Sequence, residues 1–343
     1  MSEEPSLWAA ADLLTPMAIR VAATLRLADH IAAGRTTADA LADRVGADPE
    51  ALARLLGHLA TAGVVTRAET GYALTGLGEQ LRDDHPGGQR PWLDLEGSVG
   101  RADLCFTDLL HTVRTGEPVF PRRFGRPFWE DLVADPARQA QFDGLMRSRL
   151  TTAGPDVAAA YPWAALGHVV DVGGGDGSLL IAILAAHPGL RGTVVDLPGA
   201  VDRAERAIAA AGLADRAGVA AGSFFDELPP GAGGYVLSGV LHDWPDEDAE
   251  RILQRCADAA GDTGTVLVCD HIGDTFDTEG DLRMLCYFNG RERTLEHLRT
   301  VAARAGLATV DVTPAGSRSL VALRRAAGTV RPSRPGVGSE AGR

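Results

Sequence analysis

Apolar and polar positions in the second half of the chain alternate in a way that predicts strands separated by helices. Five short apolar runs have the length of buried strands, and the residues between them have helical spacing. Strands alternating with helices indicate an α/β fold with a doubly wound parallel sheet. The predicted strands are 168–172, 192–196, 217–221, 234–238 and 265–270, the last helices are 247–260 and 295–305, and runs near 308–313 and 318–323 predict a closing antiparallel hairpin.

The first 95 residues have a different pattern, which predicts helices followed by a small hairpin. A helix over 37–45 ends at Gly46, and a second begins at Pro49 and ends at Gly63. Short strands are predicted at 64–66 and 72–74. This order is typical of a winged helix, which could bind DNA or form a dimerisation and substrate-lid domain. Because the candidate recognition helix has few basic groups, the second interpretation is favoured.

The residues at 14–27 are apolar on nearly every side of a helix, so we expect that helix to be buried, with a second subunit covering it. The predicted organisation is a winged-helix-like dimerisation domain at 1–95 and a helical linker and lid at 96–165. An α/β, Rossmann-like catalytic domain follows at 166–325. The tail at 326–343 has no apolar period, which indicates disorder.

Charge and composition narrow the function. The net charge of −13 argues against nucleic acid or an anionic membrane surface as the main partner. The four cysteines form no CxxC pair, which favours reduced thiols. No signal-peptide pattern and no run of about 20 apolar residues is visible, so a cytoplasmic location is expected.

A glycine-rich turn follows the first predicted strand, in the run Val-Asp-Val-Gly-Gly-Gly-Asp-Gly at 170–177. Glycine allows a tight turn against a ligand, and the next helix points its N-terminus at that ligand. Asp196 follows Gly173 by 23 residues, where an acid holds the ribose of a nucleotide cofactor. Asp176 would repel a pyrophosphate but suits a sulfonium, which favours S-adenosylmethionine over NAD.

A second motif, Leu-Ser-Gly-Val-Leu-His-Asp-Trp-Pro-Asp at 237–246, follows the fourth predicted strand. Ligands bind at this edge of such sheets. Together the two motifs resemble the small-molecule O-methyltransferases, a family that includes plant caffeic acid and flavonoid enzymes. Residues 15–27, 125–132 and 281–285 are similar to its anthracycline-tailoring branch, which includes carminomycin 4-O-methyltransferase and aclacinomycin 10-hydroxylase.

The resemblance implies S-adenosylmethionine as cofactor and assigns residues to it. Gly173 and Gly175 would lie against its methionine part, and Asp196 would hold its ribose. The adenine would lie against Ser223 and Phe224, where the family usually has an acid before the aromatic residue; a hydroxyl can still form a hydrogen bond there, but without charge. The cofactor-binding set is Gly173, Gly175, Asp196, Leu197, Ser223, Phe224 and Ser238.

The resemblance also implies a catalytic set. His242 matches the general base, because a phenol of pKa near 10 needs a proton acceptor at neutral pH. Asp270 and Glu292 match the two acids that orient it. The predicted substrate contacts are Phe142, Met146, Asp243 and Arg293, although a surface arginine that caps the next helix is an equal interpretation for the last. No metal-binding constellation is visible.

Three hypotheses follow. The first is an O-methyltransferase that acts on a phenolic hydroxyl of an aromatic polyketide or similar metabolite, as a homodimer. The second is a divergent hydroxylase or decarboxylase that keeps S-adenosylmethionine as a structural ligand, because the anthracycline branch contains such a protein. The third is a winged-helix regulator with a degenerate sensor domain. The retained His242 and Glu292 favour the first hypothesis.

Overall fold

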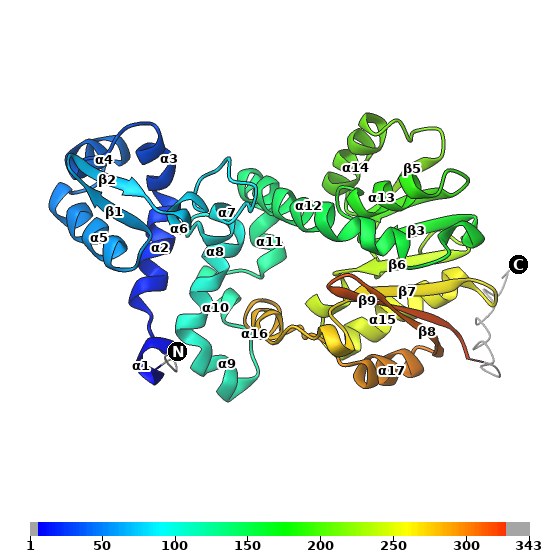
Figure 1. Cartoon of the computed structure of the whole chain (residues 1–343). Helices are drawn as coiled ribbons and strands as arrows, with labels where there is room; N and C mark the ends of the chain where they lie inside the picture. Colours follow the sequence, from blue (N-terminus) through cyan, green and yellow to red (C-terminus); the bar gives the residue numbers. More distant parts are fainter. Residues whose placement is uncertain (1–5, 327–343) are drawn as a thin grey trace, which may run out of the picture. The chain divides into compact units, whose positions relative to one another are not determined.

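The computed structural model describes residues 6–326, which fall into two compact units (Figure 1). The first unit holds the chain up to Thr152 together with Leu282–Asn289, and the second holds Ala153–Asp281 and the chain from Gly290 on. The sequence placed a boundary at 165 and did not predict the return of 282–289 to the first unit. The predicted tail lies outside the described residues, except for Ala326.

The second unit is built on a seven-stranded sheet with the strand order β5-β4-β3-β6-β7-β9-β8. The first five strands are parallel, and β9 runs antiparallel to both β7 and β8. This confirms the predicted doubly wound sheet with its closing hairpin. The strands are β3 (His168–Val172), β4 (Arg191–Asp196), β5 (Ala217–Ala221), β6 (Gly234–Ser238), β7 (Thr265–Asp270), β8 (Leu307–Ala315) and β9 (Arg318–Arg325).

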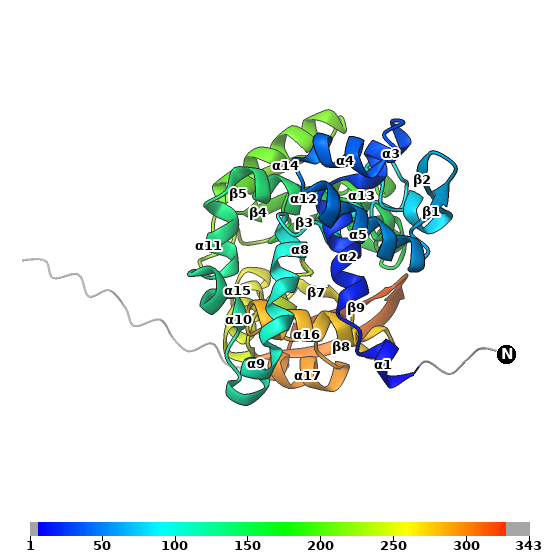
Figure 2. The ribbon, with the colours of Figure 1, turned by 90° about the vertical axis from the view of Figure 1, so that its left-hand side faces the viewer.

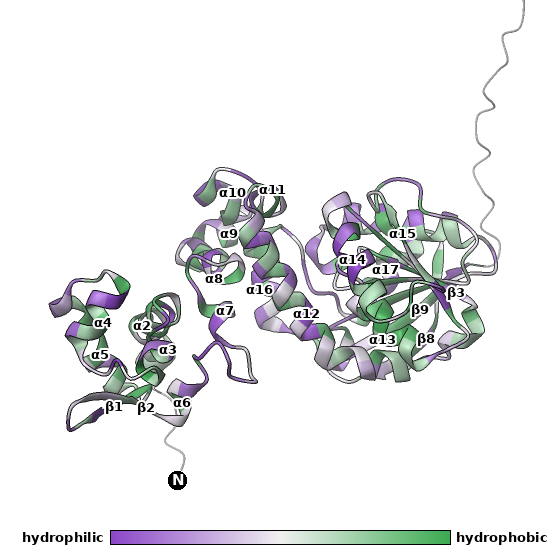
Figure 3. Cartoon of the chain, turned by 90° about the horizontal axis from the view of Figure 1, so that it is seen from above, coloured by the Kyte–Doolittle hydropathy of each residue, from purple (hydrophilic) through white to green (hydrophobic). Residues whose placement is uncertain are grey.

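Helices cover this sheet, as seen from two further directions in Figures 2 and 3. Alternate residues of the central strands, such as Val170, Tyr235 and Val268, pack with the apolar faces of α15 (Asp246–Ala260) and α17 (Leu295–Arg304). α13 (Ser178–Ala186) and α14 (Pro198–Ala210) pack against β4 and each other. A Cβ on Gly192 would lie 2.6 Å from the Leu180 side chain, so glycine lets α13 approach β4 closely.

The first unit begins with the predicted helices and hairpin. Thr37 and Asp48 cap α4 (Ala38–Val45) and α5 (Pro49–Thr61) with their side-chain oxygens. β1 (Val65–Ala68) pairs antiparallel with β2 (Gly71–Leu74). The predicted helix at 14–27 is split, because Arg26 is left-handed (φ +53°) between α2 (Leu14–Thr24) and α3 (Leu27–Ala32).

The prediction that this N-terminal helix is buried holds only in part within one chain. Its buried residues are Ala18, Ala22 and Ala23. The preceding Leu7 and Trp8, on α1 (Leu7–Ala10), are 86% and 88% exposed.

The rest of the first unit is helical and has an aromatic core. Its helices are α6 (Gly76–Glu79), α7 (Arg90–Leu93), α8 (Ser98–Ala102), η1 (Asp103–Asp108), α9 (Leu109–Thr115), α10 (Val119–Phe124), α11 (Phe128–Val133) and, as far as Thr152, α12 (Pro136–Ala159). Tyr287, from the end of α16 (Thr278–Tyr287), stacks on Phe128 with ring centroids 6.0 Å apart. Asp103 accepts hydrogen bonds from Arg20 and from Tyr287. These contacts explain why 282–289 belongs to this unit.

None of the described helices is long and apolar enough to cross a membrane. Within residues 6–326 no three His, Cys, Asp or Glu side chains are grouped as metal ligands would be. All four cysteines are buried and free.

Candidate active site

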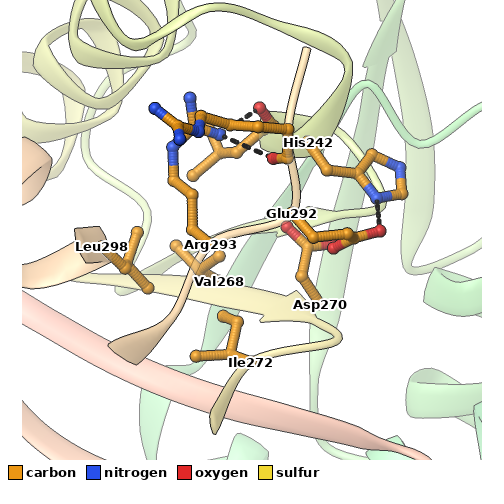
Figure 4. A pocket seen from close by; sticks show the side chains of 9 residues that line it. His242, Val268, Asp270, Ile272, Glu292, Arg293 and Leu298 are labelled. Atoms are coloured by element: carbon orange, nitrogen blue, oxygen red, sulfur yellow. Dashed lines mark hydrogen bonds and ion pairs between the residues drawn. The ribbon is translucent and has the colours of Figure 1, made fainter. Parts of the chain in front are cut away.

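The structure joins two residues of the predicted catalytic set directly. His242 lies in η3 (Leu241–Asp243), the short helix that follows β6, and its Nδ1 is 2.8 Å from Glu292 Oε1 (Figure 4). Glu292 is buried, and its backbone N–H donates to Asp281. Two segments that lie 50 residues apart in the chain therefore meet in one hydrogen bond.

The acids around His242 change its protonation. Burial alone would lower the pKa of the imidazole, but Asp243, the Glu292 hydrogen bond and Asp270 together raise it to about 9. Burial also raises the pKa of Asp243 to about 7, against the attraction of the imidazole. An imidazolium among carboxylates is thus the favoured state at neutral pH, before any ligand binds.

Asp270 acts on the site through its charge and through a hydrogen bond to the loop after β6. It ends β7, and its Oδ1 accepts the backbone N–H of Gly239 at 2.8 Å. It does not hydrogen-bond to His242. Burial raises the pKa of Asp270. With His242 and Glu292 it lines a small cavity with room for about one water molecule (Figure 4), and Glu292 Oε2, which has no hydrogen-bond partner, would suit such a water.

Gly290 is a site residue that the sequence did not predict. A Cβ at this position would lie 2.2 Å from the backbone oxygen of His242 and 2.6 Å from the carbonyl carbon of Asp243. The next residue, Arg291, donates its backbone N–H to the same His242 oxygen at 2.8 Å. Glycine therefore lets the Glu292 segment lie against the histidine turn. The Asn-Gly pair at 289–290 was the available signal.

Arg293 hydrogen-bonds within the protein, and its predicted contact with substrate stays a prediction. Its guanidinium donates to the backbone oxygens of Leu241 (2.6 Å), Trp244 (2.8 Å) and Arg291 (3.5 Å), and its remaining N–H groups reach Asp246 Oδ1. All five donors are used inside the protein. The side chain is buried, so it is not the surface arginine of the other interpretation. It fixes the loop that carries His242.

The glycine turn after β3 forms a cradle. Gly173 and Gly175 have positive φ values (+72° and +60°), which glycine adopts without strain. A Cβ on Gly173 would lie 2.9 Å from Val240 and 3.4 Å from Phe224, whereas one on Gly175 would meet nothing within 4 Å. The backbone N–H groups of Gly175 and Leu197 donate to the two carboxylate oxygens of Asp196, at 2.8 and 2.7 Å. Asp196 is thus held at the mouth of the turn.

A further acid, Asp171, lies beneath this turn and was missed as a site residue. Burial, with the charges of Asp196 and Asp176, raises its pKa to about 7, and its Oδ2 has no hydrogen-bond partner. A Cβ on Gly174 would lie 2.6 Å from its carboxyl carbon. An acid that interrupts the apolar strand was the signal. Three carboxylates near one turn favour a cationic ligand.

The other predicted cofactor residues line the neighbouring strand ends. Ser223 Oγ accepts the backbone N–H of Phe225 at 3.2 Å, and Phe224 packs edge-on against Trp244 at 5.7 Å between ring centroids. Ser238 Oγ accepts a hydrogen bond from Arg318 at 3.0 Å.

The predicted substrate residues fall in both units. Asp243 lies in the second unit, with its Oδ1 3.5 Å from His242 Nε2. Phe142 and Met146 lie on α12 in the first unit, where Phe142 packs edge-on against Phe128 and Trp129 at 5.7 and 5.6 Å. Met146 is half-buried one helical turn further on. Their contact with a substrate remains a prediction.

Comparison with known proteins gives consistent matches over most of the chain. A model of the O-methyltransferase domain matches residues 106–308, and one of the O-methyltransferase dimerisation domain matches residues 8–83. The chain is 55% identical over 318 residues to 2,7-dihydroxy-5-methyl-1-naphthoate 7-O-methyltransferase of Streptomyces carzinostaticus (92% of this chain, 96% of the relative). It is 50% identical over 319 residues to aclacinomycin 10-hydroxylase RdmB of Streptomyces purpurascens (90% and 85%).

Solved structures agree with these matches. The crystal structure of an O-methyltransferase from neocarzinostatin biosynthesis, NcsB1, in complex with S-adenosylmethionine and 2-hydroxy-5-methyl naphthoic acid, has a TM-score of 0.91 at 53% identity and covers 95% of this chain and 100% of its own. A mitomycin 7-O-methyltransferase, MmcR, has a TM-score of 0.83 at 35% identity, with 93% and 96% covered.

Proposed function

Because this chain belongs to the O-methyltransferase family and uses S-adenosylmethionine, we propose that it methylates a phenolic hydroxyl of an aromatic polyketide with His242 as general base. The observation that carries this proposal is the His242–Glu292 hydrogen bond of 2.8 Å at the carboxyl edge of the sheet. The naphthoate relative supports a fused-ring aromatic acid as the acceptor class.

The residues of the glycine turn fit the cofactor. The open space beside Gly175 and the two N–H groups that hold Asp196 leave a fixed carboxylate for ribose hydroxyls. The acids Asp171, Asp176 and Asp196 suit a cationic ligand. When bound, S-adenosylmethionine supplies an electrophilic methyl group on a sulfonium, so the remaining requirement is to position and deprotonate the acceptor.

His242 is oriented for that deprotonation. In the neutral form of His242, with Nδ1–H donating to Glu292, Nε2 presents the lone pair that accepts the phenol proton. The resulting imidazolium is stabilised by Glu292 and by the nearby Asp243 and Asp270. Arg293 and Gly290 act on the loop, because they fix the backbone that carries the histidine.

The test measures transfer of a labelled methyl group from S-adenosylmethionine to a panel of hydroxynaphthoic acids. We expect His242→Asn to lower kcat by about 10²–10⁴-fold. His168→Asn is the matched control, since His168 begins β3 at the amino ends of the parallel strands and its side chain hydrogen-bonds to Thr193. Equal activity of both variants would refute the role of His242 as general base.

The 50% identity to a hydroxylase is the observation that supports a second candidate function. Cofactor binding without label transfer to any phenol, together with a hydroxylated or decarboxylated product, would favour it. The retained histidine and glutamate support methyl transfer instead.

We also infer a homodimer formed through the N-terminal region. The match to a dimerisation domain supports it, as do the exposed Leu7, Trp8, Leu13 and Leu14. Light scattering of the purified chain should give twice the mass of one chain, and Trp8→Ser should shift the equilibrium toward monomer. A monomer at micromolar concentration would overturn this inference.

A further inference from the structure

Arg318 is a buried cation that the catalytic and cofactor sets do not include. It begins β9, is 9% exposed, and donates from Nη1 to Ser238 Oγ at 3.0 Å and to the backbone oxygen of Cys269 at 3.4 Å. The side chain therefore reaches from β9 across the end of β7 to the end of β6.

The backbone that carries Arg318 is fixed on both sides. Gly316 has φ +65°, and a Cβ there would lie 2.2 Å from Asp156 Oδ2, so the β8–β9 turn packs tightly against the end of α12. Ser319 pairs with Asp270 in the sheet, and its Oγ donates to the backbone oxygen of Ile272 at 2.9 Å. A side chain on so rigid a base can bind a ligand with little loss of entropy.

Three of the five N–H groups of this guanidinium, on Nε and Nη2, donate to no oxygen of the described residues. The guanidinium also contacts the Cys269 sulfur and is attracted by the charge of Asp270. Arg293, by contrast, uses all five donors internally. Asp270 offsets part of the buried charge of Arg318 without a hydrogen bond, and the three N–H groups still lack an oxygen acceptor within residues 6–326, which is costly in a nearly buried group. The planar edge of Nε and Nη2 matches the two oxygens of a carboxylate.

The guanidinium of Arg318 lies near the proposed base. A Cβ built on Gly239 would lie 3.8 Å from Arg318 Nη1 and 3.9 Å from His242 Nε2, so both side chains approach Gly239 from the side on which a Cβ would lie. Ser238, which Arg318 holds, ends the strand beside β3 and its glycine turn. Any anion on Arg318 therefore lies near both the proposed base and the cofactor cradle.

We propose that Arg318 binds a carboxylate group of a ligand at the end of β6 and positions that ligand beside His242. The identity of the ligands rests on the proposed function. Two carboxylates are available there, the methionyl carboxylate of the cofactor and the carboxylate of an aromatic acid acceptor. The planar edge of the guanidinium can donate hydrogen bonds to either carboxylate.

Calorimetry with the full chain tests the proposal and separates the two sources. One arm compares S-adenosylhomocysteine with its decarboxylated analogue, S-adenosyl-3-thiopropylamine. The other compares 2-hydroxynaphthoic acid with 2-naphthol, with S-adenosylhomocysteine saturating. We expect Arg318→Gln to weaken binding of the carboxylate ligand in one pair by about 10- to 100-fold and to leave its partner unchanged.

Arg324→Gln is the matched control, because Arg324 lies on the same strand and bonds to Thr265 at the other end of β7. Arg318→Lys keeps the charge without the planar edge, so it should recover part of the lost affinity, and it replaces the glutamine variant if that does not fold. Loss in the first pair assigns the cofactor carboxylate, and loss in the second assigns the acceptor.

Unchanged ratios in both pairs, or an equal loss for a carboxylate ligand and its analogue, would overturn the proposal. Because no turnover is needed, the result is independent of methyl transfer. If Arg318→Gln weakens binding of a carboxylate ligand more than binding of its analogue, but the wild-type protein transfers no label, the proposed function is refuted and the role of Arg318 stands.

Discussion

The charge of Glu292 should set the pH at which this enzyme becomes active. Glu292→Gln keeps an oxygen that can accept the His242 Nδ1–H but removes the negative charge 2.8 Å away. Replacing a charged acceptor by a neutral one costs about 1 kcal/mol of hydrogen-bond energy, and the full charge at about 4 Å is worth at most about 4 kcal/mol. Since one pKa unit is about 1.4 kcal/mol, the pKa of His242 should fall by about 1–3 units from about 9.

This shift has opposite effects at two pH values. At pH 7 a histidine of pKa about 9 is about 1% neutral, so the variant has far more of the neutral base than the wild type. At pH 9.5 the wild-type base is mostly neutral, and the variant is slower because its base is weaker. We therefore expect the variant to lose much more activity at pH 9.5 than at pH 7.

Two measurements check this prediction. Titration of the ligand-free protein with labelled histidine, followed by NMR, gives the pKa of His242 directly, and kcat/KM between pH 6 and 10 gives the acid limb of the rate profile. Glu250→Gln is the control, since Glu250 pairs with Arg304 on the surface. Coincident titration curves for wild type and Glu292→Gln would refute the reasoning.

Three further substitutions test other parts of the site. Asp171→Asn should raise the free energy of unfolding by about 2–4 kcal/mol at pH 8 and by almost nothing near pH 4. The pKa of Asp171 is raised to about 7 in the folded protein, so ionisation of this acid destabilises the fold as the pH rises from about 4 to about 7. Chemical denaturation at both pH values measures the two changes, and equal changes would contradict the prediction. Gly290→Ala should lower methyl transfer at least about tenfold by displacing the histidine turn, whereas Gly189→Ala, with open space at its Cβ, should not. Ser223→Asp should tighten S-adenosylhomocysteine about 3- to 10-fold by calorimetry if an adenine amine lies there, because it restores a charged acceptor; unchanged affinity would argue that the adenine lies elsewhere.

The strands were predictable because each is a short, mainly apolar run bounded by turn residues. β3, β5, β6 and β7 begin and end at the predicted residues, and β4 begins one residue earlier. Parallel strands that are buried on both faces, such as β6 and β7, are typically rich in apolar residues. His242, Asp196 and the glycines were found because they directly follow such strands.

The remaining features depend on contacts that no local pattern records. Arg293 looked available to a substrate, but its donors are used by backbone oxygens about 50 residues earlier in the chain. Arg318 follows a turn far from both motifs, and only the strand order β6-β7-β9 brings it to Ser238. Gly290 was visible as a turn residue, but the backbone that it approaches was not.

The eight residues Leu282–Asn289 have a consequence for protein engineering. The chain leaves the second unit after Asp281 and returns at Gly290, two residues before Glu292. Tyr287 and Phe288 meanwhile complete the aromatic core of the first unit. A chimera that exchanges only residues 1–152 between relatives would leave Tyr287 and Phe288 of the original chain in a core of foreign residues, so exchanging the first unit requires both segments to be transplanted together.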